Sequence, residues 1–557
     1  ESKYPKPWPA VLVVCGHSSN GKAYDGYQRA CGLLALNGVL ALIIDPVCQG
    51  ERYQLAQPDG KPTIAGSTTG HSLIGLGSTL LGRNTARFEI RDGMRAIDYL
   101  QSRDDVDPKR IGCTGNSGGG TQTAYLMAID QRIRCAAPSC YITSLQRLME
   151  TIGPQDAEQN IFGQLAFGMD HADYLLMRAP QPTLICCATQ DYFDIGGAWN
   201  TFRYAKRLYS RMGYPAQVNL VENDDTHGFK KPLREAAVQW MVRWLRGEDR
   251  VIREPEMEVL TDQEAWCTPL GQVVLLAGER SVFDINAGYN RELASQREKL
   301  WAEGPTAELR IRIRNVIGTR TADELPEPKV ETTDEAEHDG LRLTKIVLRP
   351  AEGIVLPGLL VEPGEQKKAN AGPVLYLAAD GAASTVGENG AVRQLVEQGH
   401  TVLALDVRGV GETAPEGKPW NSGQFGGGTK QQMLAYLLGH SMVGERTGDI
   451  LTAAAWLRQH TKSQRSGVRV VATDHLCTPA LHAAFLEPEL IGSAKLVRPL
   501  VSWTSIIETP VTKHQLPNMV HGALKVYDLP QLVKSLGKKV TIEEPRDAAG
   551  EPVTAVE

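Results

Sequence analysis

The chain has 557 residues, a length that predicts two or three domains at roughly 100–200 residues each. Hydrophobic residues make up 42% and charged residues 22%, which excludes a wholly disordered chain. The net charge of −6 predicts no broad basic surface, so we expect neither nucleic acid nor a membrane as a partner. No apolar run approaches the roughly 18 residues that span a bilayer. The ten cysteines form no C-x-x-C pair and indicate neither a disulfide framework nor structural zinc.

Strands and helices alternate along the first 248 residues. The expected elements are a strand over 11–15, a helix over 27–37, a strand over 39–44, a helix over 89–101, a strand over 110–114, a helix over 119–129, strands over 183–188 and 217–221, and a helix over 233–246. The strands are almost continuously apolar, as they are when helices cover both faces of a parallel sheet. This pattern predicts an α/β unit.

The same unit occurs twice in the chain. Residues 81–100 match residues 438–457 at a constant spacing, and residues 41–45 match residues 402–406. The second unit starts with a hairpin over 341–348 and 354–361, followed by a strand over 374–377. Since the first unit has no counterpart of this hairpin, we expect that the chain lacks one at its front.

A serine nucleophile is predicted between the strand over 110–114 and the helix that follows it. The segment Gly115-Asn116-Ser117-Gly118-Gly119 is a G-x-S-x-G motif in the strand–turn–helix context that gives the motif its meaning. Gly115 and Gly119 allow a tight turn that holds Ser117 in a strained conformation above the sheet. The N–H of Gly118, at the helix N-terminus, is then placed to bind an oxyanion.

A serine nucleophile needs a base and a carboxylate that orients the base, in the chain order Ser, Asp or Glu, His. His227 is the one histidine of the first unit after Asp191, and it lies in the loop after the last strand. Asp191 follows the strand over 183–188 and is the favoured carboxylate. Asp194 is the alternative, and either aspartate could instead cap the next helix.

The second oxyanion donor is expected from the loop after the first strand, as a backbone N–H of His17 or Ser18. The His17 side chain could contact substrate or be purely structural. The sequence assigns no role to His71 or His171. The run 170–173 has too few and too adjacent ligands for a metal site, so we expect no metal and no cofactor.

The motif around Ser117, the segments 98–100 and 106–112, and His227-Gly228 resemble the α/β-hydrolase superfamily, in particular its acetyl xylan esterase and dienelactone hydrolase-like branch. The resemblance implies an α/β fold of two tandem α/β-hydrolase domains, with mostly parallel, doubly wound sheets joined by a partly helical connector. We expect boundaries at 1–248, 249–335 and 336–557. The connector is expected to hold two helices, although the second, over 305–317, alternates Arg and Ile in a way that also permits a strand.

This resemblance also implies cofactor-free hydrolysis of a small-molecule or polysaccharide ester by Ser117, His227 and Asp191. Acetylated hemicellulose is the leading substrate, and a secreted or periplasmic location is favoured by the branch and by the missing initiator Met. The oxyanion loop departs from the His-Gly-Gly of many esterases. The similar glucuronoyl esterases usually carry Arg where this chain has Gly118, so they rank lower. The alternatives are an acylaminoacyl- or dipeptidyl-peptidase-like enzyme and a non-catalytic glycan-binding protein.

The second unit lacks the catalytic pattern. Asp474 takes the place of Ser117 without flanking glycines, and Asp547 takes the place of Asp191 with no histidine after it. We therefore expect a degenerate, non-catalytic hydrolase unit that supports the first unit, shapes its cleft or binds glycan. Trp420 and Trp503 are candidate glycan contacts, although a structural role is the simpler assumption for both. The sequence assigns no oligomeric state.

Overall fold

The computed structural model describes residues 4–64, 66–338, 340–364, 371–387, 390–416, 422–462 and 467–554. The chain forms two compact units, which are described here separately. The first contains Glu1–Gly75 and Asn84–Val282, and the second contains Leu76–Arg83 and Phe283–Glu557. The expected connector is therefore divided between the units near Val282.

A parallel sheet of six strands forms the centre of the first unit, in the order β2-β1-β3-β4-β5-β6. The strands are β1 (Trp8–Val14), β2 (Leu40–Ile44), β3 (Val106–Asn116), β4 (Ile133–Ser139), β5 (Thr183–Gln190) and β6 (Val218–Thr226). Five of them were expected from the sequence. The sequence analysis missed β4 because Arg134 and Pro138 interrupt its apolar run.

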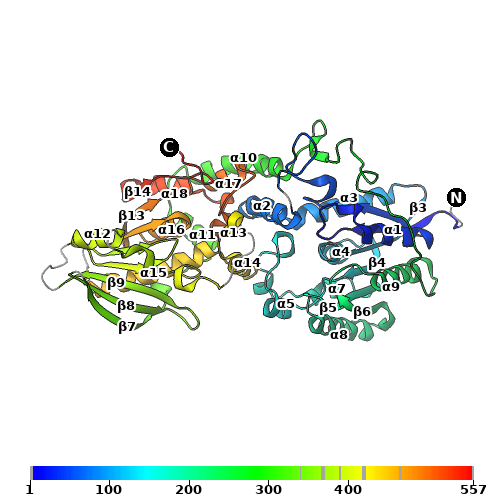
Figure 1. Cartoon of the computed structure of the whole chain (residues 1–557), viewed down its shortest axis with the longest axis horizontal. Helices are drawn as coiled ribbons and strands as arrows, with labels where there is room; N and C mark the ends of the chain where they lie inside the picture. Colours follow the sequence, from blue (N-terminus) through cyan, green and yellow to red (C-terminus); the bar gives the residue numbers. More distant parts are fainter. Residues whose placement is uncertain are drawn as a thin grey trace. The chain divides into compact units, whose positions relative to one another are not determined.

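Helices cover both faces of this sheet (Figure 1). The helices of this unit are α1 (Asp25–Leu36), α2 (Ser67–Leu80), whose residues from Leu76 on belong to the second unit, α3 (Ala86–Gln101), α4 (Gly118–Ile129), α5 (Leu145–Thr151), α6 (Gln164–Phe167), α7 (His171–Leu176), α8 (Ile195–Arg211) and α9 (Lys231–Met241), which continues as a π-helical turn (Val242–Arg246). Side chains of α1 and α9 pack with Val11 and Val13 of β1, and those of α3, α4 and α8 pack with Leu12 and Val14. Alternate residues of β1 thus enter opposite cores.

The second unit is built on a mixed sheet of eight strands, in the order β14-β13-β12-β10-β11-β9-β8-β7. The strands are β7 (Lys329–His338), β8 (Leu341–Arg349), β9 (Leu356–Pro363), β10 (Val374–Leu377), β11 (Val402–Leu405), β12 (Val468–Thr473), β13 (Ile491–Val497) and β14 (Val540–Glu543). Strands β7, β8 and β9 pair in the antiparallel sense, and β10 to β14 are parallel. Because β7 crosses the boundary expected at 335/336, the sheet of this unit begins earlier than the sequence indicated.

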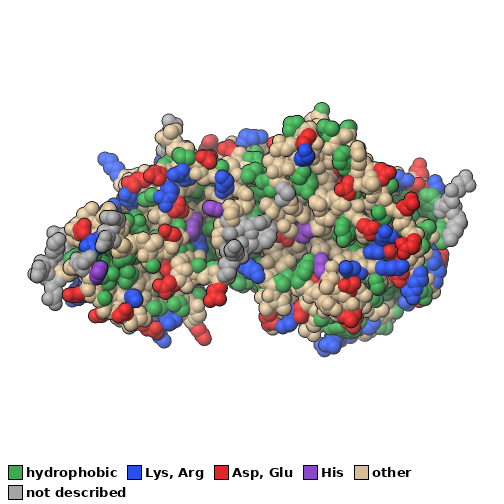
Figure 2. Space-filling view, in the orientation of Figure 1, with side chains coloured by type: hydrophobic (Ala, Val, Ile, Leu, Met, Phe, Trp, Pro, Cys, Tyr) green, Lys and Arg blue, Asp and Glu red, His purple; other side chains and the backbone are tan. Residues whose placement is uncertain are grey.

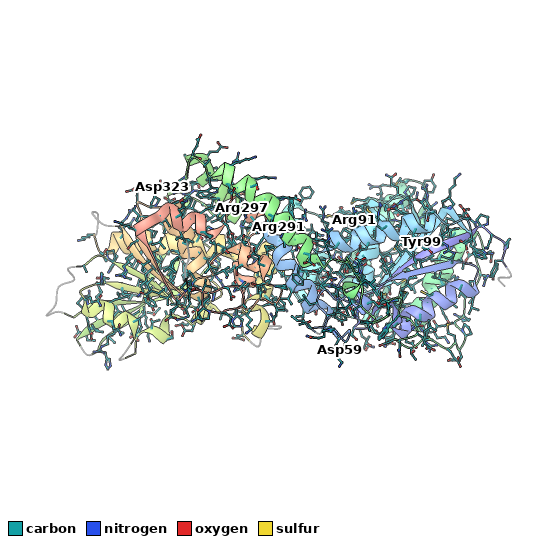
Figure 3. The ribbon with its side chains drawn as sticks, turned by 90° about the horizontal axis from the view of Figure 1, so that it is seen from above. Asp59, Arg91, Tyr99, Arg291, Arg297 and Asp323 are labelled. Atoms are coloured by element: carbon teal, nitrogen blue, oxygen red, sulfur yellow. The ribbon has the colours of Figure 1, made fainter. Side chains whose placement is uncertain are left out.

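The helices of the second unit are α10 (Val282–Leu300), α11 (Ala307–Ile317), α12 (Ala391–Glu397), α13 (Ser422–Phe425), α14 (Thr429–Leu437), α15 (Met442–His460), α16 (Cys477–Leu486), α17 (Trp503–Glu508) and α18 (Leu529–Leu536). The segment 305–317, whose alternation of Arg and Ile also permitted a strand, forms the helix α11. Its N-cap Thr306 accepts a hydrogen bond from the Leu309 N–H, and Gly318 ends it with φ +77°. Figure 3 labels Arg297 on α10, whose guanidinium donates to the Leu524 carbonyl at 2.5 Å.

One turn has the same structure in both units. Asp45 follows β2 and accepts hydrogen bonds from the backbone N–H groups of Lys22 and Glu51, while Asp406 follows β11 and accepts from those of Ala382 and Glu412. Each turn uses a glycine with positive φ, where a Cβ would lie within 2.5 Å of the carboxylate. The strand order β2-β1-β3-β4-β5 also matches β11-β10-β12-β13-β14. The matching segments of sequence therefore form matching structure.

Acidic and basic side chains are interspersed over the face of each unit that is shown in Figure 2. Among the described residues, no helix has the length and apolar character needed to cross a membrane.

Candidate active site

Ser117 lies at the sharp turn between β3 and α4. Its backbone has φ +59° and ψ −123°, a conformation that costs a non-glycine residue about 1–3 kcal/mol. The turn is held because the Ser117 N–H donates to the Ser139 carbonyl at 2.9 Å. A Cβ on Gly115 or Gly119 would lie 2.3 or 2.2 Å from the Val14 carbonyl oxygen, so both positions require glycine.

His227 and Asp191 are brought together by the loops that follow β6 and β5. Nδ1 of His227 lies 2.9 Å from Oδ1 and 3.0 Å from Oδ2 of Asp191. An ionised carboxylate can only accept, so Nδ1–H donates and Nε2 is left as the basic nitrogen. The Asp191 side chain is buried and also accepts from the Phe193 N–H at 3.0 Å. This is the arrangement that orients a general base.

The alternative carboxylate, Asp194, lies at the N-terminus of α8. It caps α8 by accepting from the Gly197 N–H at 2.8 Å, and both of its oxygens lie 3.0 Å from the Arg147 guanidinium. Its contacts are those of a helix cap.

Tyr192, which sequence reasoning missed, stands between the base and the serine. Its hydroxyl lies 2.9 Å from Nε2 of His227, and the two rings stack with centroids 4.3 Å apart. Burial raises the pKa of Tyr192 to about 12. The phenol is therefore protonated at neutral pH and donates to Nε2. The only sequence signal for this role is its position directly after Asp191.

The loop after β1 lies against the serine turn. The Gly16 N–H donates to the Tyr27 hydroxyl at 2.5 Å, and the Gln49 side chain donates to the carbonyls of Gly16 and Ser18 at 2.7 and 3.2 Å. A Cβ on Gly16 would lie 2.9 Å from Cβ of Ser117. The loop residues His17 and Ser18 are thus held next to the turn.

Gly118 also lies beside this loop, because Nε2 of His17 is 3.3 Å from the position that a Cβ on Gly118 would occupy. As the first residue of α4, Gly118 has an N–H without an acceptor inside the helix. The structure therefore places the residues expected to supply both oxyanion donors side by side.

The His17 side chain joins a buried group of charged residues. Its Nε2 lies 2.8 Å from Oε1 of Glu158 and 3.4 Å from Oδ2 of Asp156, and the neighbouring His71, with its ring centroid 5.2 Å away, faces the same two carboxylates. Burial acts to lower the pKa of His17, but the two carboxylates outweigh it and raise that pKa above its ordinary value. Burial also raises the pKa of Glu89, next to His71, to about 8. Sequence reasoning gave none of these carboxylates a role.

Two groups of residues in the first unit have the residue types of a metal site but are not suited to bind a metal. Cys140 lies within 4.8 Å of the Asp191 and His227 ligand atoms, but burial raises the pKa of its thiol to about 12 and keeps it protonated. His171 accepts from the Thr143 N–H at 3.1 Å, and burial lowers its pKa to about 4. Its neighbour Asp170 caps α7, as expected for a structural segment.

The prolyl oligopeptidase family matches residues 66–247, the segment that contains Ser117, Asp191 and His227. The first unit has the α/β-hydrolase fold. A curated relative, "Putative hydrolase YtaP" of Bacillus subtilis (strain 168), is 27% identical over 161 residues, which are 28% of this chain and 53% of the relative. The chain thus spans about half the length of that relative.

Two solved structures are similar to this hydrolase chain. "Methylesterase BT1017" has 22% identity and a TM-score of 0.38, and the similarity covers 53% of this chain and 62% of that one. A carbohydrate esterase family 15 glucuronoyl esterase from Caldicellulosiruptor kristjansonii has 15% identity and a TM-score of 0.32, over 49% of this chain and 75% of that one.

The second unit has a different residue at the position of the hydrolase serine. Asp474 follows β12 with φ +51°, and both of its oxygens accept from the Arg498 guanidinium, at 2.8 and 2.7 Å. Asp474, Arg498 and Asp547 line a cavity of about 630 Å³. The expectation that Trp503 is exposed for glycan contact is wrong, because this side chain is fully buried and donates to the Asn518 carbonyl. Trp420 lies outside the described residues.

Proposed function

We propose that the first unit is a serine carboxylic-ester hydrolase that removes acetyl or similar acyl groups from hemicellulose-type glycans. The observation that carries the proposal is the hydrogen-bonded pair of His227 and Asp191, together with the strained Ser117 at the turn between β3 and α4. A serine held above a sheet beside an oriented imidazole is suited to acyl transfer.

In the proposed reaction, Ser117 attacks the ester carbonyl and His227 receives the serine proton at Nε2. Asp191 fixes the imidazole and stabilises its protonated form. The N–H groups of Gly118 and of the His17–Ser18 loop stabilise the tetrahedral oxyanion. His227 then protonates the departing alcohol and activates the water that hydrolyses the acyl-enzyme.

The acetylated glycan is proposed because of the resemblance of the serine motif and of the segments 98–100 and 106–112 to the acetyl xylan esterase branch. A serine peptidase is the second candidate, and it is favoured by the match to the prolyl oligopeptidase family over residues 66–247. Both reactions use the same triad, so substrate tests must separate them.

For the second unit we propose a non-catalytic role. The Asp474 carboxylate is engaged by Arg498 through both oxygens and is poorly placed to attack a substrate. Among the described residues after β14 there is no histidine to act as a base.

The test compares the wild-type chain with Ser117→Ala and with Ser535→Ala, which removes an exposed hydroxyl on α18. The substrates are 4-nitrophenyl acetate, acetylated xylan, a glucuronoyl ester and an aminoacyl arylamide. We expect release of 4-nitrophenol and of acetate from xylan, a loss of at least about 10³-fold in Ser117→Ala, and no loss in Ser535→Ala.

Activity that survives Ser117→Ala would overturn the nucleophile assignment. Preferential arylamide cleavage would support the peptidase. A wild-type protein that is inactive on all four substrates but binds xylan would support the glycan-binding alternative.

A further inference from the structure

Four potential metal ligands converge in a buried group beside the proposed oxyanion loop. His17 comes from the loop after β1, His71 from α2, and Asp156 and Glu158 from the segment around the 3-10 turn Ala157–Gln159. One ligand atom from each side chain lies within 4.8 Å of the other three. The side chains of His71 and Glu158 are each 1% exposed, whereas those of His17 and Asp156 are 18% and 10% exposed, so the group is buried on one side and reachable from the other.

The hydrogen bonding of His71 leaves its second ring nitrogen facing two buried carboxylates. Nε2 of His71 lies 2.7 Å from the Val47 carbonyl oxygen, which can only accept, so Nε2–H is the donor. In the neutral ring, Nδ1 then carries a lone pair that faces Oε2 of Glu158 at 3.0 Å and Oδ2 of Asp156 at 3.6 Å. These three buried atoms make no hydrogen bond. Buried acceptors that face one another are costly unless a proton or a metal ion lies between them.

The ligand atoms lie close enough together for a single ion to reach one atom of each side chain. Zinc binds histidine nitrogen and carboxylate oxygen at about 2.0–2.2 Å in a tetrahedron, whose edges are then about 3.3–3.5 Å. The four contacts that join an imidazole nitrogen to a carboxylate oxygen measure 2.8, 3.0, 3.4 and 3.6 Å. Two neutral imidazoles and two carboxylates carry a charge of −2, which a divalent ion neutralises.

We propose that His17, His71, Asp156 and Glu158 form a zinc site. The site goes beyond the ester hydrolysis proposed above and does not depend on it. It also departs from the sequence analysis, which expected no metal and could not bring together residues from three separate segments.

The surroundings of the ligands are fixed in the way that metal sites require. His71 donates its second ring N–H to a backbone carbonyl, the usual partner of a ligating histidine. The Gln159 side chain donates to Oδ1 of Asp156 at 2.9 Å, which leaves Oδ2 for the ion. The Tyr125 hydroxyl donates to the Glu158 carbonyl at 3.2 Å. Bound zinc would join the His17 loop to α2 and to the turn, and would hold that loop next to Gly118.

The experiment uses the full chain, stripped of metal with a chelator and titrated with Zn²⁺ against a chromophoric competitor. The variants His71→Gln and Asp156→Asn each remove one ligand. His440→Gln is the matched control, since His440 is an exposed histidine with its Nδ1 2.9 Å from a Glu445 oxygen. We expect one zinc per chain in the wild type and in His440→Gln, and an affinity at least about 10²-fold lower in both ligand variants.

Zinc-edge X-ray absorption of the wild-type protein gives a result that needs no variant. It should show nitrogen and oxygen neighbours only, with the scattering of two imidazoles. A wild-type chain that fails to bind one zinc, a sulfur or all-oxygen shell, or undiminished binding by folded His71→Gln would each overturn the proposal. Zinc binding is also measured for Ser117→Ala. We expect this variant to bind zinc as the wild type does, because the proposed site does not depend on ester hydrolysis.

Discussion

The hydroxyl of Tyr192 lies 2.9 Å from Nε2 of His227, at the nitrogen that a serine hydroxyl engages in a Ser-His pair. Nδ1 of His227 is already bound by Asp191, so the neutral ring offers one lone pair, at Nε2. Tyr192 and Ser117 therefore compete for the same acceptor. Either Tyr192 moves aside when substrate binds, or it passes the serine proton to the base.

Tyr192→Phe distinguishes these two roles. If Tyr192 only competes, its removal frees Nε2 of a hydrogen bond worth about 0.5–1.5 kcal/mol, and we expect kcat/KM for 4-nitrophenyl acetate to rise about 2–10-fold. Tyr204→Phe, an exposed tyrosine of α8, is the control and should leave the rate unchanged. A fall of about 10² or more in Tyr192→Phe would contradict competition and would make Tyr192 a proton relay.

Substitutions of the two candidate carboxylates, Asp191 and Asp194, should have different effects on kcat and on stability. Asp191→Asn keeps the shape of the side chain but removes the charge that stabilises protonated His227, so kcat should fall by about 10³–10⁴-fold. Asp194→Ala should leave kcat close to the wild-type value and lower the free energy of unfolding by about 1 kcal/mol, because α8 loses its cap. Ester assays and urea unfolding measure the two effects. The reverse pattern would show that Asp194 serves the base.

The sequence predicted those features that short segments determine. The apolar strands, the glycines around Ser117 and the order of Asp191 and His227 are local or ordered patterns, and the structure contains each of them. The missed features arise from tertiary packing. Tyr192 carries no motif, and its contact with His227 depends on how two loops meet. His71 on α2 and Glu158 in the turn Ala157–Gln159 are brought together by tertiary structure, which no spacing in the sequence encodes.

Gly16 should be as sensitive to substitution as the glycines of the serine motif. In Gly16→Ala the new methyl group would lie 2.2 Å from the Asn116 carbonyl oxygen, so the loop or the serine turn must shift. A displacement of about 1 Å at the reacting centre costs on the order of 10²-fold in rate, which is the loss we expect in kcat.

Gly288→Ala is the matched control for this loss. Gly288 lies inside α10, where the added methyl group has no neighbour closer than 3.9 Å. We expect full activity and a gain of about 0.5–1 kcal/mol in stability. If Gly16→Ala remained fully active, the close packing of this loop against the serine turn would not be needed for the reaction.

Acid should destabilise the second unit through buried histidines, of which His482 is the clearest. In the neutral ring its Nδ1–H donates to the Thr478 carbonyl and its Nε2 accepts from the Tyr527 hydroxyl, both at 2.7 Å, so both nitrogens are hydrogen-bonded without a charge. Burial lowers the pKa of His482 to about 4, and the hydrogen bond to Thr478 only partly opposes this effect.

The sign of the pH dependence follows from this lowered pKa. In the unfolded chain His482 titrates near its ordinary pKa of about 6.5, so between about pH 6.5 and pH 4 the unfolded state binds a proton that the folded state does not. The contribution to the free energy of unfolding is therefore unchanged above about pH 6.5 and is lost as the pH falls. At pH 5 this loss is on the order of 2 kcal/mol.

Urea unfolding of the wild type, of His482→Gln and of the exposed His440→Gln at pH 8 and pH 5 measures this contribution. His482→Gln lowers stability at pH 8, because it loses at least one of the two buried hydrogen bonds. The further loss between pH 8 and pH 5 should be smaller than in the wild type by about 2 kcal/mol, since glutamine does not titrate. His440→Gln should keep the wild-type difference. If His482→Gln showed the full wild-type loss at pH 5, His482 would have to be protonated in the folded chain, and the hydrogen bond from Tyr527 to Nε2 could not exist in that state.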